Sequence, residues 1–189
     1  MKRAPNVVRI IGGEHRGRKL SFLPIGGLRP TPDRVRETLF NWLRDDIAGA
    51  SCLDLFAGSG ALGFEALSRG AGQLTAVEQN RAAFGRLQDN ARLLRLDDRT
   101  TLLHADAFRL IQSAAPRPFD VLFVDPPFAD RRLDRICAAL DDAGWVSDGA
   151  LVYLEQDRNA PWPCCPASWQ MLREGQAGQS AQRLLRRSS

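Results

Sequence analysis

Three glycines and one acid form the first group of residues whose spacing suggests a binding site. Gly58, Gly60 and Gly63 match the pattern G-x-G-x-x-G, and Glu78 lies twenty residues after Gly58. Glycines at this spacing let a backbone turn approach a ligand closely at a helix N-terminus, and an acid at that distance binds ribose hydroxyls. The pattern alone fits a nicotinamide-dependent oxidoreductase, or a turn that only reverses the chain.

Asp54, four residues before Gly58, favours a different ligand. A carboxylate there would repel a pyrophosphate in a partly desolvated site, but it would bind an ammonium group. S-adenosylmethionine (SAM) has an ammonium group, a carboxylate suited to the helix N-terminus, a ribose for Glu78 and an adenine amino group for Asp106. For Asp106 the alternative is a simple helix cap. The predicted cofactor-binding residues are Asp54, Phe56, Ala57, Gly58, Ser59, Gly60, Glu78, Asp106 and Ala107.

A second group, Asp125-Pro126-Pro127-Phe128, follows the apolar run 119–124. The prolines fix φ and remove two backbone donors, so the loop is stiff and its carbonyls stay free to accept hydrogen bonds. The Asp125 side chain and the Pro126 carbonyl would accept both hydrogens of an exocyclic base amine and aim its nitrogen at a methyl donor. Phe128 would stack on the flipped base, a contact worth about 1–3 kcal/mol. These four are the predicted catalytic residues; the alternative is an ordinary strand-to-helix turn with a core phenylalanine.

The elements that must position these residues alternate between apolar runs and helical patterns from residue 51 onward. Strands are expected at 51–56, 73–77, 100–104, 121–124 and 150–154, and helices at 60–69, 80–95, 107–114 and 130–142. This alternation is typical of a parallel sheet covered on both faces, where ligands bind at the carboxyl ends of the strands. Residues 168–173 and 180–186 are predicted to form a terminal antiparallel pair.

The N-terminal part predicts a different arrangement. Residues 7–11 and 15–22 are expected to form two short strands around Gly12-Gly13. Thr31-Pro32-Asp33 is a helix-start pattern in which Thr31 would cap and Pro32 would take the first helical position. The helix is expected to end near Gly49. It would bury apolar residues at helical spacing, namely Val35, Leu39, Trp42 and Leu43.

The net charge of +4 is divided unevenly along the chain. Residues 1–36 carry +7 and residues 51–160 carry −4, and all but two of the 26 basic residues are arginine. Arginine binds phosphates and stacks on bases, so this division favours a nucleic-acid partner, although codon bias alone would explain the arginine content. Arg34 and Arg36 share one helix turn, so at least one is expected to pair with Glu37 or with an acid near the cofactor site. The candidate phosphate contacts, each alternatively a solvated surface charge, are Arg9, Arg16, Arg18, Lys19, Arg29, Arg34 and Arg36.

Together these motifs resemble class I methyltransferases that act on exocyclic amino groups of nucleic-acid bases. The whole chain resembles the bacterial 16S ribosomal RNA guanine-N2 methyltransferase family of the RsmD type. The resemblance is carried by residues 9–13, 16–20, 29–31, 33–41, 52–63, 124–128 and 177–179. One departure is Gln182, where the family pattern leads us to expect an aromatic residue.

The resemblance implies a Rossmann-like α/β fold with a seven-stranded, mostly parallel sheet, an antiparallel C-terminal hairpin and a small basic N-terminal β-hairpin. Residues 1–29 would form an RNA-contacting arm and residues 30–189 the methyltransferase domain. The implied reaction is methyl transfer from SAM to N2 of a specific guanine in 16S rRNA, within an assembled or assembling small ribosomal subunit. The alternatives are an NAD-dependent oxidoreductase, a non-catalytic RNA-binding protein and a DNA adenine-N6 methyltransferase, which usually needs a target-recognition region larger than about 36 residues.

Composition argues against several other classes. The 44% hydrophobic and 25% charged fractions of this 189-residue chain are ordinary for one globular domain. No run approaches the roughly 20 apolar residues needed to span a bilayer. Because the cysteines lack C-x-x-C spacing, we expect neither a metal site nor a disulfide, and this cysteine usage fits the reducing cytoplasm best. Cys52 and Cys137 are expected to be core thiols, and the protein is expected to be a monomer. His15 and His104 are expected to have no catalytic role.

Overall fold

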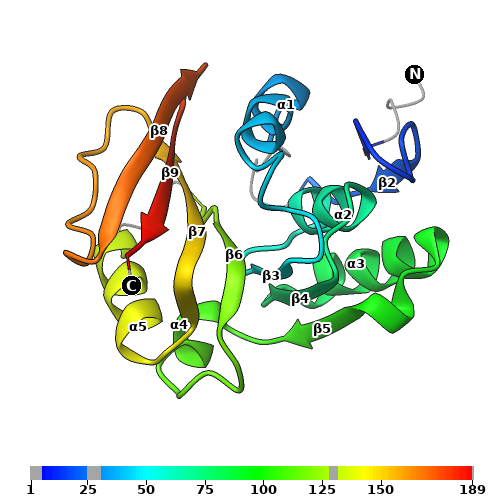
Figure 1. Cartoon of the computed structure of the whole chain (residues 1–189). Helices are drawn as coiled ribbons and strands as arrows, with labels where there is room; N and C mark the ends of the chain where they lie inside the picture. Colours follow the sequence, from blue (N-terminus) through cyan, green and yellow to red (C-terminus); the bar gives the residue numbers. More distant parts are fainter. Residues whose placement is uncertain (1–5, 25–30, 128–131, 189) are drawn as a thin grey trace.

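The main sheet has the strand order of a doubly wound α/β fold. The computed structural model describes residues 6–24, 31–127 and 132–188. Seven strands form one sheet in the order β5-β4-β3-β6-β7-β9-β8 (Figure 1). Their bounds are β3 Ser51–Asp54, β4 Gln73–Glu78, β5 Thr100–His104, β6 Phe119–Val124, β7 Val146–Asp157, β8 Trp169–Ala177 and β9 Ser180–Arg187.

The direction of these strands agrees with the sequence-based prediction. Neighbouring strands among β5, β4, β3, β6 and β7 pair in parallel, whereas β9 pairs antiparallel with both β7 and β8. The predicted seven-stranded sheet with an antiparallel C-terminal hairpin is therefore confirmed.

Helices cover both faces of the sheet. Successive strand residues point to opposite faces, and apolar residues on both faces pack against helices. Cys52 packs with α1, α2 and α3 in one apolar core, and the next residue, Leu53, packs with α4 and α5 in the other. In Figure 1, α4 and α5 accordingly lie apart from α1, α2 and α3. The helix bounds are α1 Asp33–Trp42, α2 Ala61–Ser68, α3 Arg81–Leu94, α4 Ala107–Leu110 and α5 Leu133–Asp142, with a short 3-10 turn, η1, at Asp97–Arg99.

Two helices are shorter than expected, and α1 starts differently. Pro32 is the N-cap of α1 and no side chain caps this helix, so the predicted capping role of Thr31 is wrong. The helix ends at Trp42 rather than near Gly49. The expected helix 107–114 is a single turn, because the following amides of Gln112 and Ser113 bond to carbonyls only three residues back and tighten the chain.

The N-terminal hairpin forms a separate two-stranded sheet of β1 (Val7–Arg9) and β2 (Lys19–Ser21). The predicted hairpin is confirmed, but its strands are shorter than the expected 7–11 and 15–22. It is packed onto the helices rather than projecting from them, since Val8, Ile10 and Leu20 are buried in the same core as α1, α2 and α3. At Gly13 the backbone of the hairpin lies against the end of α2: a Cβ built there would lie 1.7 Å from the carbonyl oxygen of Ser68. We call residues 6–24 the arm.

Three further observations concern the cysteines, metal-binding groups and membrane-spanning helices. Cys52 and Cys137 are buried free thiols, as predicted. Within residues 6–24, 31–127 and 132–188, no group of His, Cys, Asp and Glu is arranged to hold a metal ion. In the same ranges, no helix has both the length and the apolar character needed to cross a membrane.

Candidate cofactor and target-base site

Three predicted acids lie at the same edge of the sheet and on the same face of it. Asp54 and Glu78 are the last residues of the neighbouring parallel strands β3 and β4, and Asp125 directly follows β6 on the other side of β3. Asp54, Glu78 and Asp125 lie two residues after Cys52, Ala76 and Phe123, respectively. These three preceding residues belong to the apolar core that the sheet forms with α1, α2 and α3. Alternation along a strand therefore gives all three side chains the same face.

Asp54 is an almost fully buried carboxyl, 2% exposed. Its Oδ2 accepts a hydrogen bond from the backbone N–H of Gly63, at 3.2 Å. Burial raises the pKa of Asp54 to about 7; backbone N–H donors at Gly63 and Phe56 oppose the rise, and the Glu78 carboxylate adds to it. A carboxylate that is costly to ionise alone gains from a cation placed against it, which fits an ammonium group.

Glu78 supports the glycine turn. Its Oε2 accepts from the backbone N–H of Gly58 at 2.9 Å, and its Oε1 accepts from that of Asn80 at 2.6 Å. Gly58 and Gly60 have φ values of +53° and +85°, in the left-handed region that favours glycine. A Cβ at Gly60 would lie 2.3 Å from the ring of Phe64, so the turn needs glycine there for space as well.

The other predicted cofactor residues occupy less distinctive places. Ala57 is buried, and its N–H donates to the carbonyl of Val77 at 2.9 Å. The carboxylate of Asp106 caps α4 by accepting from the N–H of Arg109 at 3.0 Å, which is the alternative that the sequence left open. Ala107, at the start of α4, is buried. Binding of SAM by these residues stays a prediction.

Ser59 connects the glycine turn to the arm through Asn90 of α3, which is 1% exposed. The Asn90 side-chain amide donates to the backbone carbonyls of Ser59 and Ser21, both at 2.9 Å. Its Oδ1 accepts from the N–H of Ser21 at 3.0 Å. One buried side chain thus holds both β2 and the predicted cofactor turn, a link that the sequence pattern did not indicate.

Asp125 has two partners that sequence reasoning missed. Its Oδ2 accepts a hydrogen bond from Oγ1 of Thr31 at 3.2 Å. The register of β6 and β7 pairs Val124 with Leu154, so Asp125 and Glu155 follow side by side. Burial raises the pKa of Asp125 well above its ordinary value, and the Glu155 carboxylate adds to the rise. Phe128, predicted to stack on the base, lies outside the described residues.

Glu155 is itself buried, at 3% exposed. Its two oxygens accept from the hydroxyls of Tyr153, at 2.8 Å, and Ser180, at 2.5 Å. Burial raises its pKa as well. The signal that could have found it is the one that found Asp54: an acid at the end of a predicted apolar strand.

The candidate phosphate contacts divide into exposed and buried residues. Five of the candidate residues are exposed to solvent, namely Arg9, Arg16, Arg18, Lys19 and Arg34. Arg29 lies outside the described residues. The prediction for Arg36 is wrong, because this residue is 0% exposed and faces the core with Val35 and Leu39. As expected from the helix geometry, one arginine of the pair is bound to acids, but Glu37 is not the partner.

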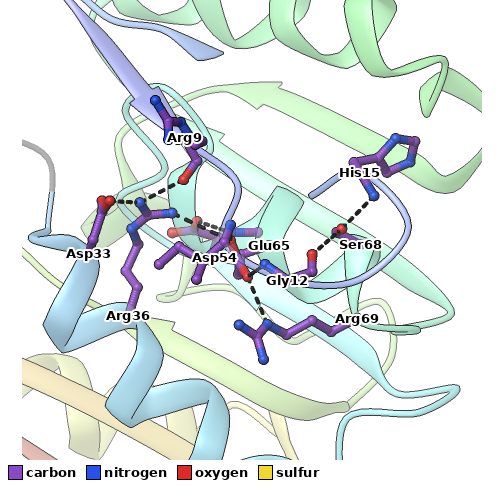
Figure 2. A network of polar contacts seen from close by, with 11 residues as sticks. Arg9, Gly12, His15, Asp33, Arg36, Asp54, Glu65, Ser68 and Arg69 are labelled. Atoms are coloured by element: carbon purple, nitrogen blue, oxygen red, sulfur yellow. Dashed lines mark hydrogen bonds and ion pairs between the residues drawn. The ribbon is translucent and has the colours of Figure 1, made fainter. Parts of the chain in front are cut away.

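Arg36 belongs to a buried polar network that joins α1, α2 and the arm (Figure 2). Its guanidinium donates to Asp33 at 2.6 Å, to the carbonyl of Arg9 at 2.7 Å and to Glu65 at 3.4 Å. Glu65, on α2, also accepts from the amides of Ile11 and Gly12, both at 2.8 Å, and from Arg69 at 2.7 Å. The network neutralises a buried charge and fixes the arm in place.

Comparison with known proteins identifies the relatives of this chain. The model of the family described as "Conserved hypothetical protein 95" matches residues 8–186. "Ribosomal RNA small subunit methyltransferase D" of Escherichia coli K12 is 46% identical over 182 residues, covering 96% of this chain and 91% of that protein. The protein of the same name from Haemophilus influenzae is 40% identical, covering 96% and 94%.

Solved structures agree with this assignment. A structure from Escherichia coli matches with a TM-score of 0.88 at 43% identity, over 97% of this chain and 99% of that one. Another structure, solved in complex with S-adenosylhomocysteine (SAH), has a TM-score of 0.77 over 98% of this chain and 57% of its own, and at 16% identity it shows a likeness of fold alone. This chain therefore belongs to the conserved hypothetical protein 95 family, together with the ribosomal RNA small subunit methyltransferases D.

Proposed function

We propose that this protein transfers the methyl group of SAM to the exocyclic N2 of a guanine in 16S rRNA. The observation that carries the proposal is the row of acids on one sheet edge, where buried Asp54 and half-buried Asp125 lie on the same face of neighbouring strands. Both ligands need acids there, since the cofactor is cationic and the target is an amine. The proposal is supported by relatives named as small-subunit rRNA methyltransferases at 46% and 40% identity.

The residues at this edge fit the cofactor. The Asp54 carboxyl, with its raised pKa, suits the ammonium group, and the positive-φ glycine turn exposes backbone at the N-terminus of α2 for the carboxylate. When bound, SAM supplies a methyl group already activated by its sulfonium. No covalent enzyme intermediate is then required, and the protein contributes alignment and electrostatics.

Asp125 and Pro126 orient the target amine in this mechanism. The Asp125 carboxylate and the Pro126 carbonyl accept the two N2 hydrogens, which directs the nitrogen lone pair toward the methyl carbon. As the N–C bond forms and the S–C bond breaks, positive charge grows on N2, and ionised Asp125 stabilises it. The alkylated amine then releases one proton to water, so Asp125 need not be a strong base.

The exposed basic side chains of the arm are the proposed rRNA contacts, along with Arg34 on α1. Phosphate contacts by such groups give affinity that falls steeply with salt. We propose that the substrate is presented within an assembled or assembling small ribosomal subunit. The arm is too short to recognise a target nucleotide by itself, so recognition of the target guanine would depend on RNA shape and on neighbouring ribosomal proteins. A cytoplasmic monomer is proposed with it.

The test is methylation of rRNA from cells that lack the protein, using radiolabelled SAM and mass-spectrometric identification of the modified nucleoside. We expect N2-methylguanosine at one site. Asp125→Asn should lower the rate strongly while SAH and rRNA affinities stay unchanged, and Asp98→Asn, at an exposed acid, is the matched control. Methylation of adenine N6, or a wild-type rate for Asp125→Asn, would contradict the proposal.

A further inference from the structure

Thr31 is a buried hydroxyl that the helix beside it does not use. It is 9% exposed and directly precedes Pro32, the N-cap of α1, where no side chain caps the helix. Its Oγ1 instead donates to Oδ2 of Asp125, a residue 94 positions later in the chain. A hydroxyl committed to a carboxylate across the fold needs an explanation other than helix capping.

The surroundings of Asp125 show why this hydroxyl matters. Among residues 6–24, 31–127 and 132–188, the charged groups that act on the pKa of Asp125 are Glu155 on β7 and Asp54 on β3, and both are acids. Tyr153, also on β7, donates its hydroxyl to Glu155. The Thr31 hydroxyl is thus the hydrogen-bond donor in this group that favours the ionised form of Asp125.

The position of Thr31 is itself fixed. Two residues farther on, Asp33 bonds to Arg36, whose guanidinium reaches Glu65 on α2 and the Arg9 carbonyl of the arm (Figure 2). The start of α1 is therefore bonded to two other elements, and these bonds fix the place from which Thr31 donates its hydrogen bond to Asp125. A hydrogen bond from a fixed donor selects one orientation of the carboxylate.

We infer that Thr31 is a positioning residue for methyl transfer: it holds one oxygen of Asp125, so that the other oxygen faces the target amine. The inference rests on the proposed function, since it assigns Thr31 a part in the step that Asp125 serves. The Thr31 donor thereby favours the ionised form of Asp125 and fixes its orientation among neighbouring acids. In this role Thr31 acts through Asp125 and not through the cofactor or the base.

The test compares Thr31→Val, which keeps the shape and removes the donor, with Thr31→Ser, which keeps the donor. A hydrogen bond to a charged group is typically worth enough to change a rate roughly tenfold or more, so we expect that loss in single-turnover methyl transfer for Thr31→Val. The acid limb of its pH profile should move to higher pH, because the carboxylate loses a donor. Thr31→Ser should restore both.

Thr38→Val is the matched control, since the Thr38 hydroxyl also lies on α1 but donates to the Arg34 carbonyl at 3.0 Å, in an exposed position. All three variants should stay folded and keep wild-type SAH affinity. The inference is overturned if Thr31→Val stays within about twofold of wild type at every pH, or if Thr31→Ser is as impaired as Thr31→Val. Failure of the proposed function looks different: Asp125→Asn would then be as active as wild type.

Discussion

Removing the Glu65 carboxylate should destabilise the fold and release the arm. Glu65 is 0% exposed and accepts four hydrogen bonds, two from arm amides and two from Arg36 and Arg69. Glu65→Ala leaves the buried Arg36 with Asp33 as its remaining ion-pair partner, on a side chain that is 66% exposed. Breaking a buried pair in this way costs about 4 kcal/mol.

For a chain of this size, that loss lowers the melting temperature by roughly 8 to 16 °C. Urea denaturation followed by tryptophan fluorescence gives the free energy of unfolding, and hydrogen exchange at the amides of Ile11 and Gly12 reports release of the arm. Glu37→Ala, at an exposed acid on α1, is the control and should change stability by less than about 0.5 kcal/mol. A loss below about 1 kcal/mol for Glu65→Ala would refute the reasoning.

The double variant separates the ion pair from the backbone contacts. Arg36→Met combined with Glu65→Leu replaces the buried charges by apolar groups, so its cost should be clearly smaller than the sum of the single variants. The cost that remains belongs to the amides of Ile11 and Gly12 and the Arg69 guanidinium, which lose their acceptor, and to the Arg9 carbonyl, which loses its donor. Additive single-variant effects would contradict coupling between Arg36 and Glu65.

Other expected outcomes concern the cofactor acid, the basic side chains of the arm and its glycines. SAH affinity measured by calorimetry should strengthen as pH rises through about 7, because Asp54 must be ionised to hold the ammonium group; a constant affinity between about pH 6 and pH 8 would contradict this role. Replacing both Arg16 and Arg18 by alanine should make rRNA binding less salt-dependent, with the slope falling by about one unit for each phosphate that is no longer neutralised. Gly13→Ala should displace the arm and weaken rRNA binding but not SAH binding. Gly17 has a similar positive φ, and a Cβ built there meets nothing within 4 Å, so Gly17→Ala should weaken rRNA binding much less.

The parts of the site that the sequence predicted share one property: each depends on residues close together in the chain. The apolar run before Asp54, the glycines after it and the acid at Glu78 follow from strand and turn patterns that span a few residues. Parallel strands then bring their carboxyl ends to one edge, so three acids could be placed together without knowledge of any contact. The same alternation predicted a parallel sheet, whereas the order of its strands is known from the structure.

The residues that the sequence misassigned depend on contacts between distant elements. Thr31 matches a capping pattern locally, but Asp125 competes for its hydroxyl from across the fold. Arg36 belongs to a basic segment by composition, yet its place on α1 turns it into the core, where Glu65 neutralises it. In both cases a tertiary partner decided the role, and no spacing rule identifies that partner.

Buried polar groups connect the arm, the predicted cofactor turn and the predicted target-base site. The arm is fixed from two sides, by Glu65 of α2 at Ile11 and Gly12 and by Asn90 of α3 at Ser21. Asn90 also bonds to the cofactor turn, and the Glu65 network holds the start of α1, from which Thr31 reaches Asp125. In the proposed function, a base presented by RNA on the arm would therefore meet a methyl donor and an acceptor carboxylate whose positions are set by the same few side chains. Loosening the arm should then impair catalysis even where RNA still binds, because the geometry and not the affinity is lost.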